Sequence, residues 1–490
     1  MLKIEYRLRH ALHSVDTTRR MEHVVQATLP AHTLMQRAGL AVAQLALAIA
    51  PHARHIWIAC GPGNNGGDGL EAAMHLQQWG KAPVVTWLGD PNHAPADSIR
   101  SWQRAVAAGV TFSQMPPDRV DLCIDALLGI GTDIRTPKGH MAEWITHMNT
   151  SKAPVLAVDL PSGLYADTGV VAPLSVRASH TLSLLTLKPG LFTAHGRDAA
   201  GTVWLDGLTG GSNPPASQPD TAPTAWLGSS PTPATRLHAS HKGSFGDVAI
   251  VGGASGMTGA ALLAASAALH AGAGRVFVGL LADDAPNVDM SQHELMFRPV
   301  ESLDFSSKTV VCGCGGGEAV QRHLFRILST TTPVILDADA INSIAKNEPL
   351  QVLLRGRAQH AAATVLTPHP LEAARLLDTT VTRIQDNRLG AAQQLATRFA
   401  CTVVLKGSGT VIAAPGQTPV INPTGNGKLA TAGTGDVLAG MIGAYLASGV
   451  TAFESACQAV YHHGETADQW SIRRPLVAGS LARAVSAFAE

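Results

Sequence analysis

The residues best suited to chemistry lie in glycine-rich segments that follow short apolar runs. The first segment, Gly61-Pro-Gly-Asn-Asn-Gly-Gly-Asp-Gly69, has five glycines in nine residues. Glycine allows backbone N–H groups to turn toward a ligand, and a helix predicted over 70–80 would add its positive end. The segment therefore predicts a binding site for phosphate or pyrophosphate. It does not combine the Gly-x-Gly-x-x-Gly spacing with an acidic residue about twenty positions after the last glycine of that spacing, which argues against an ordinary hydride-transferring Rossmann site.

Two further apolar runs end in aspartates, Asp125 in Asp-Ala-Leu-Leu-Gly and Asp159 in Asp-Leu-Pro-Ser-Gly. The carboxyl ends of parallel strands share one edge of a sheet, so we expect both side chains in the crevice beside the glycine loop. Asn65, Asp125 and Ser162 offer only oxygen ligands, which suit an alkali or alkaline-earth cation rather than zinc. A turn or helix cap explains either aspartate alone equally well, but three such loops on one sheet favour a site.

A second group of candidate residues lies near the end of the chain. Gly433-Thr-Gly-Asp436 precedes an apolar helix, so backbone N–H groups can form an oxyanion hole and Asp436 can take a proton from a hydroxyl. This arrangement suits phosphoryl transfer, although a first-turn carboxylate can also merely stabilise its helix. Lys406 and Thr410, in a glycine turn, can reach nucleotide phosphates, and His369 lies at another strand end between prolines. No Walker motif is present, which argues against a P-loop enzyme.

These residues require strands that end at the site, and the sequence predicts them in both halves. Short apolar runs alternate with helix-length segments, the pattern of an α/β fold with parallel sheets. In the first half a helix is predicted over 31–49 and strands over 55–59, 84–88, 120–124, 155–158 and 181–186. In the second half strands are predicted over 248–251, 275–279, 309–312, 334–336, 364–366 and 402–405. A proline-rich stretch between the halves predicts three segments: a domain over 1–210, a linker over 211–233 and a domain over 234–490.

Composition excludes several classes of protein. The 36 basic residues balance 36 acidic ones, so no overall charge favours nucleic acid or an anionic membrane. The six cysteines form no Cys-x-x-Cys pair, which argues against a zinc site or a disulfide framework and for a reducing, cytoplasmic location. The uncharged stretch 252–274 is too rich in small residues to predict a membrane span.

The motifs of the first half resemble those of the NAD(P)H-hydrate epimerase family. The resemblance rests on Gly63 to Gly69, Asp125 to Gly129 and Val158 to Gly163, and extends over about 12–208. It implies a Rossmann-like three-layer αβα domain that interconverts the C6 epimers of hydrated NADH and NADPH, with Asp159 acting at the ring and K⁺ held by Asn65, Asp125 and Ser162. The implied dinucleotide contacts are Asn64, Asn65, Gly66, Gly67, Asp68, Gly129, Ile130, Gly131, Thr132, Asp133, Ile134, Arg135 and Asp159. Met74 and Ile130 depart from the family pattern, where an arginine and a Gly-Thr-Gly are common.

The second half resembles the ribokinase-like ADP-dependent NAD(P)H-hydrate dehydratase family over about 234–489. The resemblance implies that ADP phosphorylates the C6 hydroxyl of the S epimer with Mg²⁺ present, and that AMP, phosphate and the restored ring follow. Asp436 would be the base, and the nucleotide would contact Lys406, Gly407, Ser408, Gly409, Thr410 and Gly435. The hydrate would contact Ala260, Gly315, His369 and Asp436. Cys314, Lys428 and Leu429 depart from the family pattern.

Together these features predict a bifunctional repair enzyme that binds a small-molecule dinucleotide and an adenine nucleotide. We expect a homo-oligomer that contacts neither nucleic acid nor membrane. Two alternatives differ in class: a ribokinase-like small-molecule kinase with a non-catalytic N-terminal binding domain, or an N-terminal binding module such as occurs in RNA-decapping scaffolds. The loops at Asp125 and Asp159 and the neutral charge argue against the second alternative.

Overall fold

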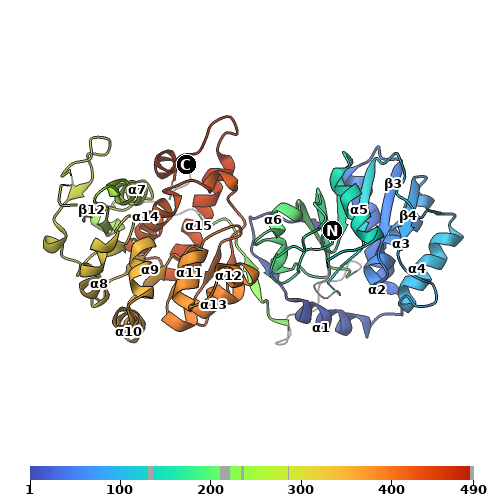
Figure 1. Cartoon of the computed structure of the whole chain (residues 1–490), viewed down its shortest axis with the longest axis horizontal. Coiled ribbons are helices and arrows are strands. Elements are labelled where there is room, and N and C mark those ends of the chain that lie inside the picture. Colours follow the sequence, from blue (N-terminus) through green and yellow to red (C-terminus); the bar gives the residue numbers. More distant parts are fainter. Residues whose placement is uncertain (131–135, 210–220, 233–236, 285, 486–490) are drawn as a thin grey trace. The chain divides into compact units, whose positions relative to one another are not determined.

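The chain folds into two compact α/β units (Figure 1). The computed structural model describes residues 1–130, 136–209, 221–232, 237–284 and 286–485. The first unit consists of Met1–Glu5 and His10–Trp226, and the second of Tyr6–Arg9 and Leu227–Glu490. The short segment Tyr6–Arg9 therefore clusters with the second unit, although the sequence places it in the first half.

The first unit is built on a twisted sheet in which β3 and β6 occupy central positions. Parallel pairing joins every neighbouring pair of strands except β1 and β9, which are antiparallel. The order across the sheet is β1 (Leu2–Lys3), β9 (Thr202–Asp206), β8 (His180–Leu184), β7 (Val155–Val158), β6 (Leu122–Ala126), β3 (His55–Cys60), β4 (Ala82–Trp87) and β5 (Thr111–Phe112). The strands that follow β3 in the chain lie on both sides of it, β4 on one side and β6 on the other. This reversal of strand order leaves a crevice at the carboxyl ends of the central strands.

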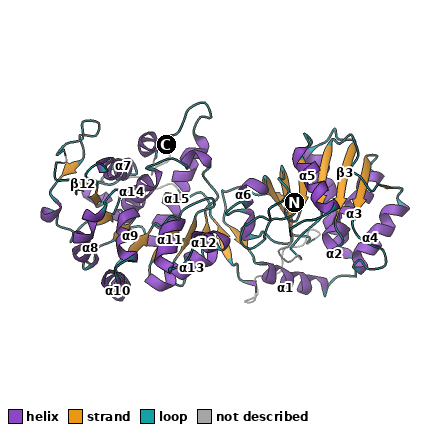
Figure 2. Cartoon of the chain, viewed as in Figure 1, coloured by secondary structure: helices purple, strands orange, loops and turns teal. Residues whose placement is uncertain are grey.

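Helices cover both faces of this sheet. The reason can be seen in β3, whose side chains point alternately to the two faces of the sheet. Ile56 and Ile58 point into a core formed with α2 (Thr33–Ile49), α3 (Asn64–Gln78) and α4 (Ala96–Ala107). The intervening Trp57 and Ala59 point into a second core formed with α5 (His140–Thr150). Because β3 is apolar on both sides, it can only be stable between two helical layers (Figure 2). The predicted three-layer αβα architecture is confirmed.

The second unit has a longer sheet that is parallel over most of its width. Its order from β13 onward is β13 (Met296–Phe297), β12 (Arg275–Leu280), β11 (Asp247–Gly252), β14 (Thr309–Cys312), β15 (Val334–Leu336), β16 (Thr364–Leu366), β17 (Thr402–Leu405), β18 (Val411–Ala413) and β19 (Val420–Ile421). The strands from β13 to β17 pair in parallel, whereas β17, β18 and β19 form an antiparallel meander.

Two groups of helices accompany this sheet. One contains α7 (Thr258–His270), α14 (Thr434–Ala447), α15 (Ala452–Gln469) and α16 (Ala478–Ala484), with α14 packed on β11, β14 and β15. The other contains α8 (Gln321–Leu328), α9 (Ala338–Ala345), α10 (Glu348–Gly356), α11 (Pro370–Leu377), α12 (Val381–Asp386) and α13 (Arg388–Phe399). Almost every residue of α14 is buried, which agrees with its apolar sequence.

The predicted strands are present in both units, with ends that shift by at most two residues. One prediction was wrong: the supposed linker 211–233 contains a strand, β10 (Ala225–Leu227). Ala225 and Leu227 are fully buried there. An isolated three-residue strand is too short for its own sequence pattern to outweigh the prolines around it, so only its tertiary partners reveal it.

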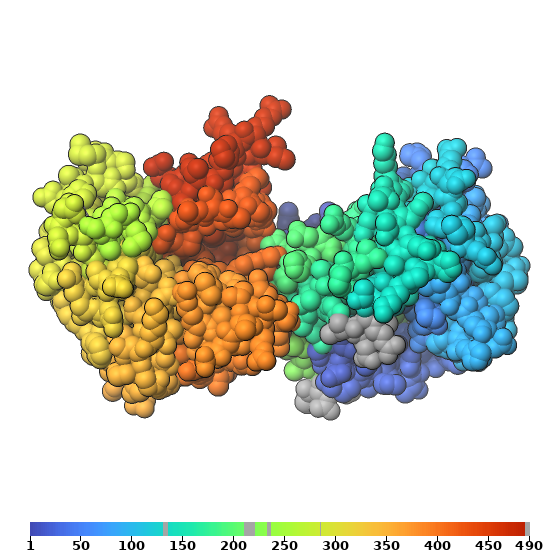
Figure 3. Space-filling view, in the orientation of Figure 1, coloured from blue at the N-terminus to red at the C-terminus, as the bar shows by residue number. Residues whose placement is uncertain are grey.

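Most large apolar side chains are buried, and the exposed ones are scattered. The segment between α15 and α16 projects from the surface of the second unit (Figure 3), and its Ile472 is 91% exposed. Within the described ranges, the helices all lack the combination of length and apolar character needed to cross a bilayer.

Candidate active sites

The glycine-rich loop after β3 is shorter than the sequence predicts. Helix α3 begins at Asn64, so Gly66 and Gly67 belong to its first turns and are buried. A Cβ on Gly66 would lie 2.1 Å from the carbonyl oxygen of Gly61, and one on Gly67 would lie 2.6 Å from Sδ of Met35. These two glycines let α3 pack tightly against its neighbours, and they are not among the residues that line the cavity of this unit. The helix end at Gly63 and Asn64 is the part that faces a ligand.

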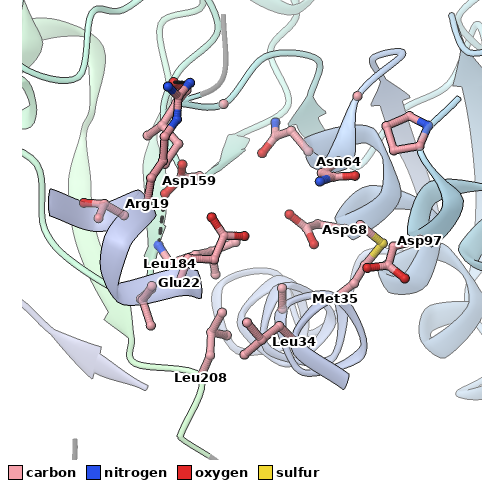
Figure 4. Close-up of a pocket in the computed structure, with 18 of the residues that line it drawn as sticks. Arg19, Glu22, Leu34, Met35, Asn64, Asp68, Asp97, Asp159, Leu184 and Leu208 are labelled. Atoms are coloured by element: carbon pink, nitrogen blue, oxygen red, sulfur yellow. Dashed lines mark hydrogen bonds between the residues drawn. The ribbon is translucent and has the colours of Figure 1, made fainter. Parts of the chain in front are cut away.

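The strand-end loops of the first unit converge on one cavity of about 460 Å³. Of the residues predicted to bind the dinucleotide, the cavity is lined by Asn64, Asn65, Asp68, Gly129, Ile130 and Asp159. The opposite wall comes from helices α1 (Val15–Gln26) and α2 (Figure 4). The predicted contacts Gly131, Thr132, Asp133, Ile134 and Arg135 lie outside the described residues. The volume falls in the range of small-molecule sites.

Asp159 occupies a strained position directly after β7. Its φ is +68°, a left-handed conformation that non-glycine residues adopt rarely and often at functional sites. The ammonium of Lys188 donates to Oδ1 of Asp159, and the backbone N–H of Leu184 donates to the same oxygen at 3.2 Å. Lys188 also donates to the carbonyl of Leu184 at 2.8 Å. The carboxylate is thus held at the cavity wall by a fully buried cation.

Three more carboxyl groups line the same cavity, those of Glu22, Asp68 and Asp97, and the first two have perturbed pKa values. Burial, with a smaller contribution from the charge of Asp159, raises the pKa of Glu22. Burial raises the pKa of Asp68 well above its ordinary value, and the charges of Asp159 and Glu22 add to the effect. Several interacting carboxyl groups around one cavity are typical of an acid–base site.

The predicted cation ligands form a buried cluster beneath the cavity. The N–H and Oγ of Ser162 donate to the carboxylate of Asp125 at 2.8 and 2.6 Å, and the N–H of Leu128 donates to Oγ of Ser162 at 2.9 Å. A Cβ on Gly129 would lie 3.0 Å from Oδ1 of Asn65, which places this amide beside the same loop.

An alkali cation fits this cluster. Asp125 is fully buried within β6, and no ion pair between described residues involves it. Burial raises its pKa to about 6. The buried amide nitrogen of Asn65 has no hydrogen-bond partner among the described residues. A cation would balance the carboxylate, and the available side-chain oxygens are the hard ligands that such an ion prefers.

The second unit gathers its charged residues at the ends of β14, β15 and β17. Nζ of Lys406 donates to Oδ1 of Asp337 at 2.6 Å, and Oγ1 of Thr367 donates to the same oxygen at 2.7 Å. One sulfur or oxygen atom from each of Cys314, Asp337 and Asp436 lies within 4.8 Å of the others. The segments that follow β14, β15, β16 and β17 therefore meet the start of α14 at one place.

Asp436 lies in the first turn of α14. Gly433 precedes this helix with φ of +92°, and a Cβ on Gly435 would lie 3.4 Å from Nζ of Lys406. Burial raises the pKa of Asp436 to about 7, with a further contribution from the charge of Asp337. A half-buried carboxyl group that titrates near neutrality beside free helix N–H groups is suited to act as a general base.

Three further residues of the second unit are predicted to contact the hydrate: Ala260, Gly315 and His369. A Cβ on Gly315 would lie 2.8 Å from that of Ala260, so these two residues adjoin each other next to Cys314. His369 caps α11: its Nδ1 accepts from the N–H groups of Leu371 and Glu372 at 3.0 and 3.3 Å. Burial and then the charge of Lys406 lower the pKa of His369.

The loop predicted to hold the nucleotide, Lys406, Gly407, Ser408, Gly409 and Thr410, directly follows β17. The buried guanidinium of Arg388 donates to the carbonyls of Leu405 and Lys406, both at 3.1 Å, and this fixes the start of the loop. Gly407, with φ of +134°, then turns the chain. The ammonium of Lys406 is paired with Asp337 at 2.6 Å, and its contact with the nucleotide stays a prediction.

Sequence reasoning missed Lys188 and Asp337, although both had a signal. Asp337 follows a buried strand and precedes α9, the same context that identified Asp125 and Asp159. Lys188 follows β8 in a Lys-Pro-Gly turn, but an isolated lysine is ordinarily exposed. Only its complete burial shows that it has a partner.

Known proteins match both units. Residues 248–487 match the family described as NAD(P)H-hydrate dehydratase, and residues 31–190 match the YjeF-related protein N-terminus. A solved structure of the Bacillus subtilis ADP/ATP-dependent NAD(P)H-hydrate dehydratase, co-crystallized with ATP/Mg²⁺, is 31% identical with a TM-score of 0.44 and covers 52% of this chain and 92% of its own.

Curated relatives extend over one unit or over both. The ADP-dependent (S)-NAD(P)H-hydrate dehydratase of Neisseria meningitidis serogroup B (strain ATCC BAA-335 / MC58) is 43% identical over 262 residues, which is 52% of this chain and 87% of that protein. The Bifunctional NAD(P)H-hydrate repair enzyme Nnr of Escherichia coli (strain K12) is 34% identical over 493 residues, which is 95% of this chain and 90% of that protein. Since this similarity extends over nearly the full length of both chains, the chain belongs to the family of bifunctional NAD(P)H-hydrate repair enzymes.

Proposed function

We propose that the first unit interconverts the R and S epimers of hydrated NADH and NADPH, and that the second unit dehydrates the S epimer with ADP as co-substrate. Membership in the family supports this assignment. So does the presence of a separate cluster of carboxyl groups in each unit, around Asp159 in the first and around Asp436 in the second. The division makes chemical sense because spontaneous hydration yields both epimers, whereas a chiral site accepts one.

In the first unit, Asp159 is the group that exchanges a proton with the substrate at C6. Its pairing with Lys188 and its strained backbone fix the carboxylate at the cavity wall. The walls formed by Asn64, Gly129 and Ile130 would contact the dinucleotide. A positioned carboxylate of this kind accelerates proton transfer by about 10² to 10⁴.

Asn65, Asp125 and Ser162 would hold K⁺ in the first unit. When bound, this cation would supply positive charge beneath the cavity and balance the buried carboxylate of Asp125. The bond from Leu128 to Ser162 ties the cluster to the loop that ends in Gly129 and Ile130. The three residues would thereby keep this loop in the conformation that lines the cavity.

In the second unit, Asp436 takes the proton of the C6 hydroxyl while the hydroxyl oxygen attacks the terminal phosphorus of ADP. AMP leaves, and the phosphate then leaves C6 as the ring nitrogen supplies electrons and C5 loses a proton. Gly407, Thr410 and the backbone around Gly435 would hold the nucleotide, whose phosphates Mg²⁺ would partly neutralise. Asp337 would hold the ammonium of Lys406 beside Gly435, where it could contact the phosphate that is transferred.

The proposal depends most on the position of Asp436 at the start of α14, among Cys314, Asp337 and Lys406. Its test is the incubation of purified protein with mixed epimers of hydrated NADH, ADP, Mg²⁺ and K⁺, followed by NADH absorbance. Complete conversion is expected. Conversion that stops when the S epimer is consumed would contradict the epimerase assignment, and no conversion would favour a small-molecule kinase instead.

A further inference from the structure

Four carboxyl side chains line the cavity of the first unit, and one of them, Asp97 on α4, is paired with His32 and Arg100. Asp159 follows β7, Asp68 lies in the first turns of α3, and Glu22 lies on α1 (Figure 4). The motifs found in the sequence include Asp159 and Asp68 but not Glu22.

Glu22 is placed by the amphipathic character of α1. Ser14 caps this helix, and its side chain accepts from the N–H of Thr17. Thr18, Glu22 and Gln26 follow at a spacing of four residues, so they share one face of the helix, and all three line the cavity. An ordinary surface glutamate would lie on the opposite, solvated face.

The charge of Glu22 is not matched by a cation, unlike that of Asp159. Its carboxylate accepts one hydrogen bond, from Nε2 of Gln26 at 3.3 Å. The ion pairs between described residues do not include Glu22, although Arg19 and His23 are close on the same helix and act with Lys188 to lower its pKa. Burial and the facing carboxylate of Asp159 outweigh them, and the pKa is raised. Glu22 therefore holds its proton at a higher pH than a solvated glutamate does.

Inversion at C6 requires one base and one acid. When a base removes the proton of the C6 hydroxyl, the bond between C6 and ring nitrogen N1 breaks, and N1 must receive a proton. The resulting aldehyde rotates about the bond between C5 and C6. Return of both protons along the same routes closes the ring on its other face. No oxidant or co-reactant is consumed, and both catalytic groups recover their starting states.

We propose that Glu22 is the second catalytic residue of this cavity, donating a proton to N1 while Asp159 accepts the proton of the hydroxyl. The inference rests on the proposed epimerase function and deepens it. Both groups line the cavity and come from separate elements, Glu22 from α1 and Asp159 from the end of β7, so each can reach a different atom of the ring (Figure 4). The ammonium of Lys188 is paired with the carboxylate of Asp159, whereas Glu22 has no ion-pair partner among the described residues.

Asp68 is the competing candidate for the proton donor. Burial raises its pKa, and so do the charges of four carboxylates: Asp159, Glu22, Glu71 and Asp97. Asp68 lies on α3 with Asn64 and Asn65, whereas Glu22 comes from α1. The experiment therefore includes a variant of each residue.

The experiment compares Glu22→Gln, Glu22→Asp and Asp68→Asn with the full-length wild-type protein, using epimerisation of hydrated NADH as the assay. Glu143→Gln is the matched control, because Glu143 is an exposed glutamate on α5 that lines no part of the cavity. Thermal unfolding checks that each variant is folded. We expect Glu22→Gln to lower kcat/KM by about 10² to 10⁴ and Glu22→Asp to recover part of the loss.

The pH profile separates a catalytic role from a structural one. Because Glu22 must be protonated to donate, wild-type kcat/KM should fall as pH rises through its pKa, and Glu22→Gln should remove this limb. An unchanged rate in Glu22→Gln, or a high-pH limb that disappears only in Asp68→Asn, would overturn the inference while the epimerase function stands. If the wild type does not accelerate epimerisation, the proposed function itself fails.

Discussion

At the scale of single residues, Asp436 is the proposed general base of the second unit. Asp436→Asn keeps the size of the side chain but removes its ability to accept a proton. We expect the dehydration rate to fall by about 10² to 10⁴, with epimerisation unchanged. Single-turnover formation of NADH from the S epimer measures the first rate, and chromatographic separation of the epimers measures the second. Equal loss of both activities would contradict the division of labour.

The same residue sets an expected pH dependence. Burial and Asp337 raise the pKa of Asp436 to about 7, and a general base works only as the carboxylate. The kcat/KM for dehydration should therefore fall about tenfold per unit as pH drops below this pKa, and level off above it. The measurement is kcat/KM against pH with saturating ADP and Mg²⁺. A flat profile from pH 5 to 8 would show that Asp436 is not the base.

At the scale of elements, the packing of α3 against its preceding loop should be sensitive to a single methyl group. A Cβ on Gly66 meets the carbonyl oxygen of Gly61 at 2.1 Å, and this backbone atom cannot move away cheaply. We expect Gly66→Ala to destabilise the first unit by about 1 to 3 kcal/mol. Gly63→Ala is the control, because no atom lies within 4 Å of its added Cβ and its φ is −99°. Thermal unfolding of both variants checks this, and equal melting temperatures would refute it.

At the scale of the whole molecule, two separate sites imply that two inactive variants can complement each other in solution. Asp159→Asn alone should convert only the S epimer of hydrated NADH, and Asp436→Asn alone should form no NADH. Since the substrate diffuses between molecules, an equal mixture of the two proteins should restore complete conversion. NADH absorbance over time measures the result. A mixture that still stops at the S epimer would mean that the substrate must pass between sites within one chain.

The sequence also determined much of the architecture. Continuous apolar runs with glycine-rich ends are specific for buried parallel strands, so the strands around both sites were predictable to within two residues. The strands β9 and β10 were not predicted. β10 has only three residues, and so short a strand depends on its neighbours more than on its own pattern. The predicted start of α3 was also too late, at residue 70 instead of Asn64. A glycine that allows close packing cannot be distinguished in the sequence from a glycine that binds a ligand.

By itself, the sequence determined which strand ends carry Asp125, Asp159 and Asp436, and the family to which their motifs belong, because these are local patterns. Only the tertiary structure decided the partners of those residues. Lys188 and Asp337 are far along the chain from the carboxylate and the ammonium that they neutralise, and their significance appears only through burial. Glu22 likewise becomes a candidate for catalysis only because one face of α1 lines the cavity. The pKa of a side chain depends on the charges and the solvent around it, and these are set by the folded structure and not by the residue type alone.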